Sequence, residues 1–187
     1  MIISVIPAKG SSSRLKNKNM RFLLKKPLIY WTIKHALESK FIDKIYVSTD
    51  SEKIAKFAKK MKVGVIKRPK KLCGEIPIFD VYKHAYQKLV KKNKVKIIVG
   101  LQPDHPDRTI TVDKVISIFK NRKLDALFSC DEKKIKNGSY YLIKKNILEG
   151  KKVKKKFTVL DNCTNIHYLA DLKKIEKKFN EKKIKYS

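Results

Sequence analysis

Near the start of the chain, a short apolar run opens into a loop of small residues and cations. The run at 2–6 has the length and β-branched content of a strand buried on both faces. The loop combines Gly10 and three serines with four cations, namely Ser11, Ser12, Ser13, Lys9, Arg14, Lys16 and Lys18. Small residues let backbone N–H groups approach a ligand, and hydroxyls add donors. The loop therefore has the chemistry of a polyphosphate cradle, although a polar surface turn carrying lysines has the same composition.

A second loop, 102–108, carries a carboxamide, two carboxylates, an imidazole and a guanidinium around two prolines that fix its path. A carboxylate here could hold Mg²⁺, a hard cation that takes oxygen ligands and shares them with substrate phosphates. In the alternative interpretation, Asp104 and Asp107 cap the next helix. We favour the functional interpretation, because loops with fixed backbones often carry sites.

The order of the expected elements is that of an α/β protein. Hydrophobic patterning predicts strands at 2–6, 44–48, 63–66, 95–101 and 125–129, and helices from Pro27, at 51–62, 80–92 and 111–121. This alternation predicts βαβ units in a single domain, residues 1–187, with a Rossmann-like three-layer α/β/α fold and a mainly parallel, mixed sheet. A further helical stripe of Leu169, Leu172, Ile175 and Phe179 is expected to belong to the core.

Both chemically rich loops follow strands of this sheet. Ligands of such sheets bind beyond the carboxyl ends of the strands, where strand order reverses. If the strands at 2–6 and 95–101 are neighbours, both loops face one crevice.

The chain is strongly basic, with a net charge of +30 over 187 residues. Its 47 cations include five arginines and therefore 42 lysines, spread along most of the sequence. Specific phosphate and base recognition relies on arginine's planar fork, so this composition indicates a general bias more than a dedicated patch. A basic field still attracts anionic substrates. Nucleic-acid binding is the competing hypothesis, but no homeodomain, zinc-finger, RRM or KH signature is present, and we expect no specific nucleic-acid partner.

Cys73, Cys130 and Cys163 are odd in number and far apart. This pattern favours a reducing compartment over a disulfide framework or a structural zinc site. No signal peptide and no apolar run of ~18 residues are visible, so we expect a cytoplasmic protein without a membrane partner.

Several short motifs occur in register along the first part of the chain. They are the stretch at 6–15 with Lys18–Asn19, then 26–29 with Thr32–Ile33, 47–50, Arg68–Pro69 with Leu72, Asp80–Val81 with His84–Ala85, and 101–103. In this order they resemble the CMP-sugar synthetases, the cytidylyltransferases that activate sialic acids and related keto-sugar acids for surface glycans. The wider nucleotidyltransferase superfamily shares the first loop.

The resemblance implies transfer of CMP from CTP to a sugar acid, with release of pyrophosphate and Mg²⁺ as the cofactor. Lys9, Lys18 and Asp104 would be the catalytic residues, with Asp104 also on the metal. CTP would lie over the first loop, with its base held around Ala8 and by 74–80. The implied nucleotide-binding residues are Pro7, Ala8, Gly10, Ser11, Ser12, Ser13, Arg14, Asn19, Arg68, Asp80 and Gln102.

Some positions depart from the family pattern. Lys9 stands where the family usually has arginine. Asn165 and His167 stand where it has metal-binding aspartates, so either Asp104, with His167 as a further candidate, holds the metal, or this member is slow, altered in substrate or inactive. The segment at 129–138 is short for a family that places its dimer-forming insertion there, which leaves a homodimer open.

Four other features have simpler interpretations. His35 and His84 lie in expected helices without metal-spaced partners, and we expect them to be packed or surface residues. Asp50 either caps the next helix, a role that Ser51 could also fill, or contacts the ligand. The lysine-rich stretch 151–156 is expected to be a solvated turn.

Overall fold

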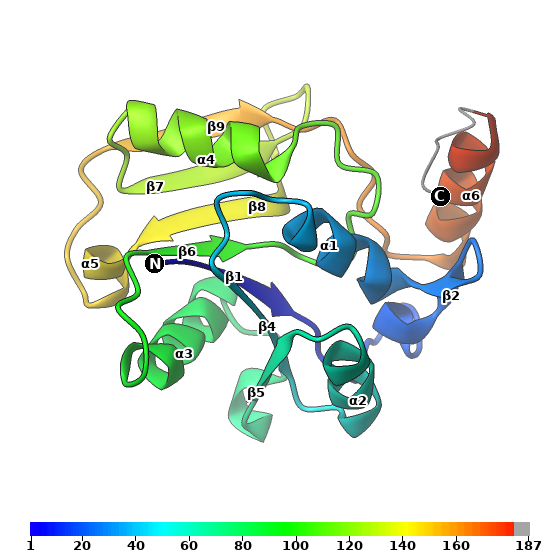
Figure 1. Cartoon of the computed structure of the whole chain (residues 1–187). Helices are drawn as coiled ribbons and strands as arrows, with labels where there is room; N and C mark the ends of the chain where they lie inside the picture. Colours follow the sequence, from blue (N-terminus) through cyan, green and yellow to red (C-terminus); the bar gives the residue numbers. More distant parts are fainter. Residues whose placement is uncertain (182–187) are drawn as a thin grey trace.

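The computed structural model describes residues 1–181, which form a seven-stranded sheet between helices (Figure 1). In chain order its strands are β1 (Ile2–Pro7), β4 (Lys44–Thr49), β5 (Gly64–Lys67), β6 (Ile97–Gly100), β7 (Ala126–Cys130), β8 (Lys136–Lys144) and β9 (Lys156–Leu160). Their order in the sheet is β5-β4-β1-β6-β8-β7-β9. Strand β8 is antiparallel to both of its neighbours, and the other pairs are parallel. The predicted mixed, mainly parallel sheet is confirmed.

Helices cover both faces of the sheet. The apolar cores place α1 (Leu28–Leu37), α2 (Glu52–Lys60) and α4 (Val112–Asn121) on one face, and α3 (Ile78–Val90) and α5 (Lys145–Leu148) on the other. Strand β1 contributes to both cores, because alternate side chains of a strand point to opposite faces. Ile6 packs with the first group of helices, and Ile3 and Val5 pack with the second. The three-layer α/β/α arrangement is therefore confirmed.

A third apolar cluster lies beside the sheet. A small hairpin of β2 (Phe22–Leu23) and β3 (Lys26–Pro27) packs with the start of α1 and with α6 (Leu169–Glu181). Figure 1 shows α6 next to β2 at one side of the molecule. The predicted stripe is buried at Leu172, Ile175 and Phe179, whereas Leu169 is 47% exposed. The cluster also holds Leu15 of the first loop, so α6 helps to fix that loop.

The bounds of the predicted elements differ from the observed ones by at most two residues. The first helix begins at Leu28 rather than Pro27, which precedes it as the N-cap residue. The short 3₁₀ turns η1 (Lys18–Met20) and η2 (Lys70–Leu72), the hairpin, β8, α5 and β9 were not predicted. Residues 151–156 are exposed, in agreement with the expected solvated stretch.

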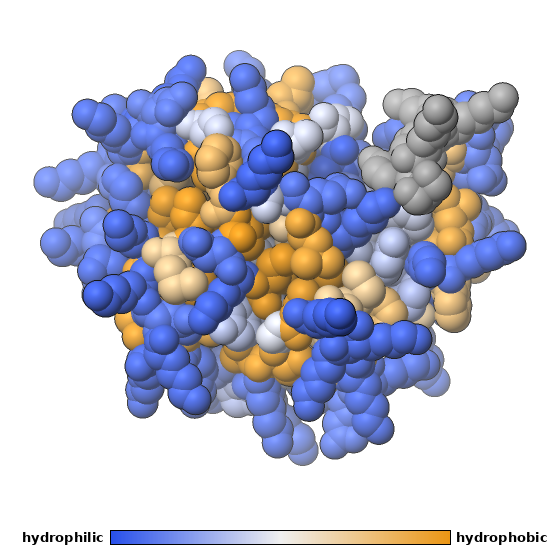
Figure 2. All heavy atoms as spheres, in the orientation of Figure 1, coloured by the Kyte–Doolittle hydropathy of each residue, from blue (hydrophilic) through white to orange (hydrophobic). Residues whose placement is uncertain are grey.

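On the face shown in Figure 2, hydrophilic side chains surround an apolar central area. Cys73, Cys130 and Cys163 are free, as expected. Within residues 1–181, no helix is both long enough and apolar enough to cross a membrane.

Candidate active site

The two chemically rich loops lie side by side because the strands that carry them are neighbours. Strands β1 and β6 pair in parallel, with Val5 opposite Gly100. Just beyond their carboxyl ends, Lys18 Nζ lies 2.7 Å from Asp104 Oδ2 and donates to the Ile166 carbonyl at 2.8 Å. The prediction that both loops face one crevice is confirmed, and the C-terminal segment reaches the same place.

Two hydrogen bonds hold the first loop in shape, one to Asp50 after β4 and one within the loop. The Gly10 N–H donates to Asp50 Oδ1 at 2.8 Å, and the Asn19 amide donates to the Lys9 carbonyl at 2.9 Å. Asp50 is therefore not the cap of α2; Ser51 fills that position and accepts from the Ile54 N–H. The loop is already ordered by the chain itself.

Two clefts open here, one of about 160 Å³ between the two loops and one of about 150 Å³ between the first loop, Glu75 and His167. Both are lined by Lys9 and Lys18. Of the other predicted site residues, the first cleft is lined by Pro7, Asn19, Arg68, Gln102 and Asp104, and the second by Ser12, Ser13, Arg14 and His167. Most of the predicted site residues thus converge on one region.

Four predicted residues are placed differently. Ala8 is fully buried, and its N–H donates to the Ser48 carbonyl at 2.9 Å, which leaves only its carbonyl for a base. Gly10 uses its N–H on Asp50 and lines neither cleft. Ser11 and Asp80 are exposed and line neither cleft. Asp80 lies in the first turn of α3, from which Ile78 and Val81 line the first cleft in its place.

Arg68 forms one wall of the first cleft from within the protein. It is 5% exposed, and its guanidinium donates to the Ser48 carbonyl at 2.7 Å and to the Ser48 hydroxyl at 3.3 Å. Arg68 thereby ties the chain after β5 to the end of β4. Its remaining donors are those that a ligand in the cleft would meet.

Asp104 is an ionised carboxylate between two nitrogen-bearing side chains. Burial by itself would raise its pKa, but the nearby His105 ring and the Lys18 ammonium outweigh burial and hold the pKa well below its usual value. His105 Nδ1 lies 3.1 Å from Asp104 Oδ1, and the His105 side chain is fully buried. The carboxylate therefore keeps its negative charge throughout the physiological pH range.

The C-terminal segment joins the site through His167. The ring Nδ1 of His167 lies 3.0 Å from the Arg14 guanidinium. The backbone N–H groups of His167 and Tyr168 both donate to Asp171 Oδ2. Burial, with Lys18 and Arg14 nearby, lowers the pKa of His167. The ring is thus neutral at pH 7 and pairs with a cation of the first loop.

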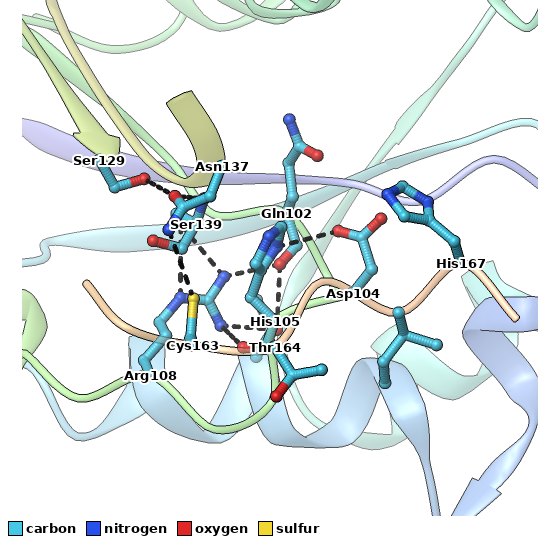
Figure 3. Close-up of polar contacts among 12 residues, drawn as sticks. Gln102, Asp104, His105, Arg108, Ser129, Asn137, Ser139, Cys163, Thr164 and His167 are labelled. Atoms are coloured by element: carbon cyan, nitrogen blue, oxygen red, sulfur yellow. Dashed lines mark hydrogen bonds and ion pairs between the residues drawn. The ribbon is translucent and has the colours of Figure 1, made fainter. Parts of the chain in front are cut away.

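Arg108 organises the second loop, a role that sequence reasoning missed. The guanidinium is 8% exposed and donates to the Gln102 carbonyl at 2.6 Å, to the His105 carbonyl, and to the Ser139 carbonyl on β8 (Figure 3). It also donates to the Thr32 hydroxyl on α1 at 3.0 Å. One buried side chain therefore fixes the loop to a strand and a helix.

The two carboxylates of the second loop do not cap α4. Thr111 occupies the N-cap of that helix and accepts from the Lys114 N–H. Asp107 is buried, accepts from the Thr164 N–H at 2.9 Å and forms an ion pair with Lys178 of α6. The capping alternative for Asp104 and Asp107 was wrong, since both carboxylates bind partners distant in sequence.

The donor set for a metal is small. Within residues 1–181, no group of three or more His, Cys, Asp or Glu side chains could hold a metal ion together. Asp104 is the carboxylate that lines the first cleft, and Glu75 lines the second. The Asn165 side-chain oxygen is buried without a hydrogen-bond partner in the described part of the chain. Mg²⁺ binds through one or two carboxylates plus substrate phosphates and waters. The residues fit an ion that a substrate helps to hold, and imidazole nitrogen is a poor ligand for it, which argues against His167.

The comparisons with known proteins agree with this geometry. A family model described as cytidylyltransferase matches residues 3–185. The chain is 35% identical over 111 residues to an N-acylneuraminate cytidylyltransferase of Escherichia coli, a match that covers 59% of this chain and 26% of that protein. It is 53% identical over 57 residues to a CMP-N,N'-diacetyllegionaminic acid synthase of Legionella pneumophila, covering 30% and 25%. The chain thus matches about a quarter of the length of these curated relatives.

Among solved structures, a CMP:2-keto-3-deoxy-manno-octonic acid synthetase complexed with CTP superposes with a TM-score of 0.77. That match covers 97% of this chain and 99% of the other at 15% identity, so it shows that the two chains share a fold. The family model spans nearly the whole sequence, and the fold agrees with that of the solved neighbour. The chain belongs to the cytidylyltransferase family.

Proposed function

We propose that residues 1–187 form a single nucleotidyltransferase domain that transfers CMP from CTP to a sugar acid. The acceptor would be a nonulosonate or a related keto-sugar acid, and the product would serve the synthesis of surface glycans. Family membership supports the reaction class, and the names of the relatives suggest the acceptor class. The observation that carries the proposal is the meeting of Lys18 and Asp104 across the two loops.

In the proposed reaction, the anomeric hydroxyl of the sugar acid attacks the α-phosphorus of CTP. The bond from the α-phosphorus to the bridging oxygen breaks, pyrophosphate leaves, and the hydroxyl proton is released. Such a transfer depends on positioning and charge neutralisation rather than on covalent chemistry by the protein. Lys9, Lys18 and Arg14, which line the paired clefts, would bind the phosphate tail.

The other predicted residues would shape the site. Asn19 holds the Lys9 carbonyl and so keeps the first loop folded around the phosphates. Gln102 would contact the nucleotide or the sugar; its side chain lies against Gly138, where a Cβ would come within 2.9 Å of the Gln102 amide nitrogen. Asp104 orients Lys18 and would hold Mg²⁺ jointly with the substrate. When bound, Mg²⁺ stabilises the charge that develops on the leaving group.

The proposal is tested by pyrophosphate release. The purified protein is incubated with CTP, Mg²⁺ and a panel of nonulosonic and octulosonic acids, and we expect release with at least one acid. Parallel reactions with ATP, GTP and UTP serve as controls for the base. Absence of release with every acid, despite CTP binding, would contradict the proposed transfer.

A second candidate function is that of a silent nucleotide-binding relative. The specific observation in its favour is the small donor set: Asp104 is already paired with Lys18, and Asn165 and His167 carry no negative charge. Stabilisation of the fold by CTP without any turnover would favour this candidate.

We further propose a cytoplasmic protein, in keeping with its free cysteines. A homodimer is the assembly that we propose to test. Sedimentation of the purified chain distinguishes a dimer from a monomer.

A further inference from the structure

A larger hollow lies outside the paired clefts. It is a groove of about 970 Å³ between β4 and β5 on one side and α3 on the other. Its cationic lining, which we name the basic groove, consists of Lys44, Lys67, Arg68, Lys70, Lys88 and Lys92. Of these, only Arg68 also lines the cleft beside Lys18. The groove is therefore a separate surface that meets the candidate active site at one end.

The cations of the groove lack acidic partners. Within residues 1–181, Lys67, Lys70, Lys88 and Lys92 form no ion pair, although ion pairs occur elsewhere on the molecule. The carboxylate among the lining residues is Asp50, which already accepts the Gly10 N–H. Unpaired cations on a concave surface concentrate anions from solution.

The surroundings of His84 agree with this concentration of positive charge. His84, which also lines the groove, has its pKa lowered by burial and then by Lys88, Arg68 and Lys71. The cations around His84 thus disfavour a further positive charge in the groove.

The floor of the groove is apolar and includes an aromatic ring. Tyr46, Val65 and Leu89 line it together with the charged side chains. The Tyr46 ring lies against Gly64 on the neighbouring strand, where a Cβ would come within 2.3 Å of a ring carbon. Glycine at this position thus makes room for the ring on the floor.

We propose that the basic groove binds single-stranded nucleic acid without sequence preference. Thr49 pairs with Lys67, so the groove follows β4 over five residue steps from Lys44 to the level of Lys67, about 17 Å. Proteins that bind single strands in this way combine a positively charged groove with aromatic side chains on which bases stack. Lysines neutralise phosphates as point charges and read no sequence. The proposal goes beyond nucleotidyl transfer and does not depend on it.

The experiment measures binding of a fluorescent oligouridine of about twelve nucleotides by anisotropy across a series of salt concentrations. A groove variant, Lys67→Glu with Lys88→Glu, is compared with a matched control, Lys56→Glu with Lys60→Glu. Both control lysines are exposed on α2, on the opposite face of the sheet. The two variants have the same net charge, so a general effect of the +30 charge affects both equally.

We expect the groove variant to bind oligouridine about tenfold more weakly than wild type. The slope of log binding constant against log salt concentration should become shallower by about 1.4, the value for two lost phosphate contacts to a single strand. The control should stay within about threefold of wild type. Equal weakening in both variants would overturn the proposal, because binding would then reflect overall charge alone.

A second comparison tests the class of ligand. Tyr46→Leu should weaken binding of oligouridine but not of a polyphosphate chain of equal charge, because only the bases stack on the ring. Equal loss for both ligands, or polyphosphate that binds more tightly than oligouridine, would overturn the assignment to nucleic acid. CTP should stabilise the groove variant against unfolding as much as it stabilises the wild type. This measurement tests nucleotide binding at the active site separately from nucleic-acid binding in the groove.

Discussion

At the scale of single residues, the site depends on a cation and a carboxylate from different loops. Lys18 and Asp104 are 86 positions apart in the chain, yet their side chains lie 2.7 Å apart. Each is about one-seventh exposed, so neither is fully hydrated. Breaking a largely buried pair by removing one partner is costly, because the other charge is left uncompensated.

We predict that Lys18→Met lowers kcat/KM for CTP by about 10²- to 10³-fold, the loss seen when one stabilising group for transition-state charge is removed. It should also lower the free energy of unfolding by about 3 kcal/mol, since Asp104 loses its partner. The measurements are steady-state kinetics and urea unfolding. Lys16→Met is the matched control, because Lys16 is an exposed lysine of the same loop that lines neither cleft. Equal effects of both substitutions would contradict the assigned role of Lys18.

Arg108 acts on the backbone of the second loop rather than on a ligand. We predict that Arg108→Lys lowers the melting temperature by about 4–8 °C, which corresponds to about 2 kcal/mol for a chain of this size. The reason is that lysine lacks the fork that reaches the Gln102, His105 and Ser139 carbonyls together. Arg122→Lys, at an exposed arginine on the C-cap of α4 whose guanidinium lies over the Phe157 ring, should lower the melting temperature by less in differential scanning calorimetry.

At the scale of elements, α6 connects the C-terminal segment to the first loop. Its apolar stripe packs on Leu15, Leu28 and Trp31, and Lys178 pairs with Asp107 of the second loop. The helix therefore contacts both halves of the site. Its packing should influence nucleotide binding as well as stability.

We predict that Ile175→Ala lowers the free energy of unfolding by about 2–5 kcal/mol, because Ile175 is fully buried and the change leaves a cavity. Ile135→Ala is the control, since Ile135 is 61% exposed and the expected change is within about 0.5 kcal/mol. Chemical denaturation gives both values. An effect of Ile175→Ala no larger than that of Ile135→Ala would show that α6 does not pack as described.

The elements that hydrophobic patterning could identify were strands and helices of the repeating βαβ part. The missed elements have physical reasons. β9 alternates charged, polar and apolar residues at the sheet's edge, so it carries no long apolar run. β8 does hold an apolar run at 140–143, which patterning could have identified, although its antiparallel pairing departs from the βαβ repeat. The roles of Asp50 and Arg108 depend on contacts 40 and up to 76 positions away, which no local pattern encodes.

At the scale of the whole molecule, the histidines link stability to pH. The pKa of His35 falls to about 3 through burial and then the charge of Arg108, and those of His84 and His167 are also lowered. The folded state therefore binds fewer protons than the unfolded chain below the ordinary histidine pKa of 6.5. Stability is fully present above that pH and is lost as pH falls from about 7 towards 3.

We predict that the unfolding free energy of the wild type decreases between pH 7 and pH 4, and that His35→Gln makes this decrease smaller. Glutamine does not titrate and so removes the largest single contribution. Urea unfolding at a series of pH values provides the measurement. An unchanged slope in His35→Gln would show that His35 titrates normally in the folded protein.

The proposed function requires that residues of both loops bind the phosphate tail of CTP together. Isothermal titration of CTP, with and without Mg²⁺, tests it on the wild type, Lys9→Met and Asp104→Asn. We predict that Lys9→Met weakens CTP binding in both conditions, whereas Asp104→Asn removes the gain in affinity that Mg²⁺ gives the wild type. CTP affinities equal to the wild type in both variants, with Mg²⁺ present, would contradict the account.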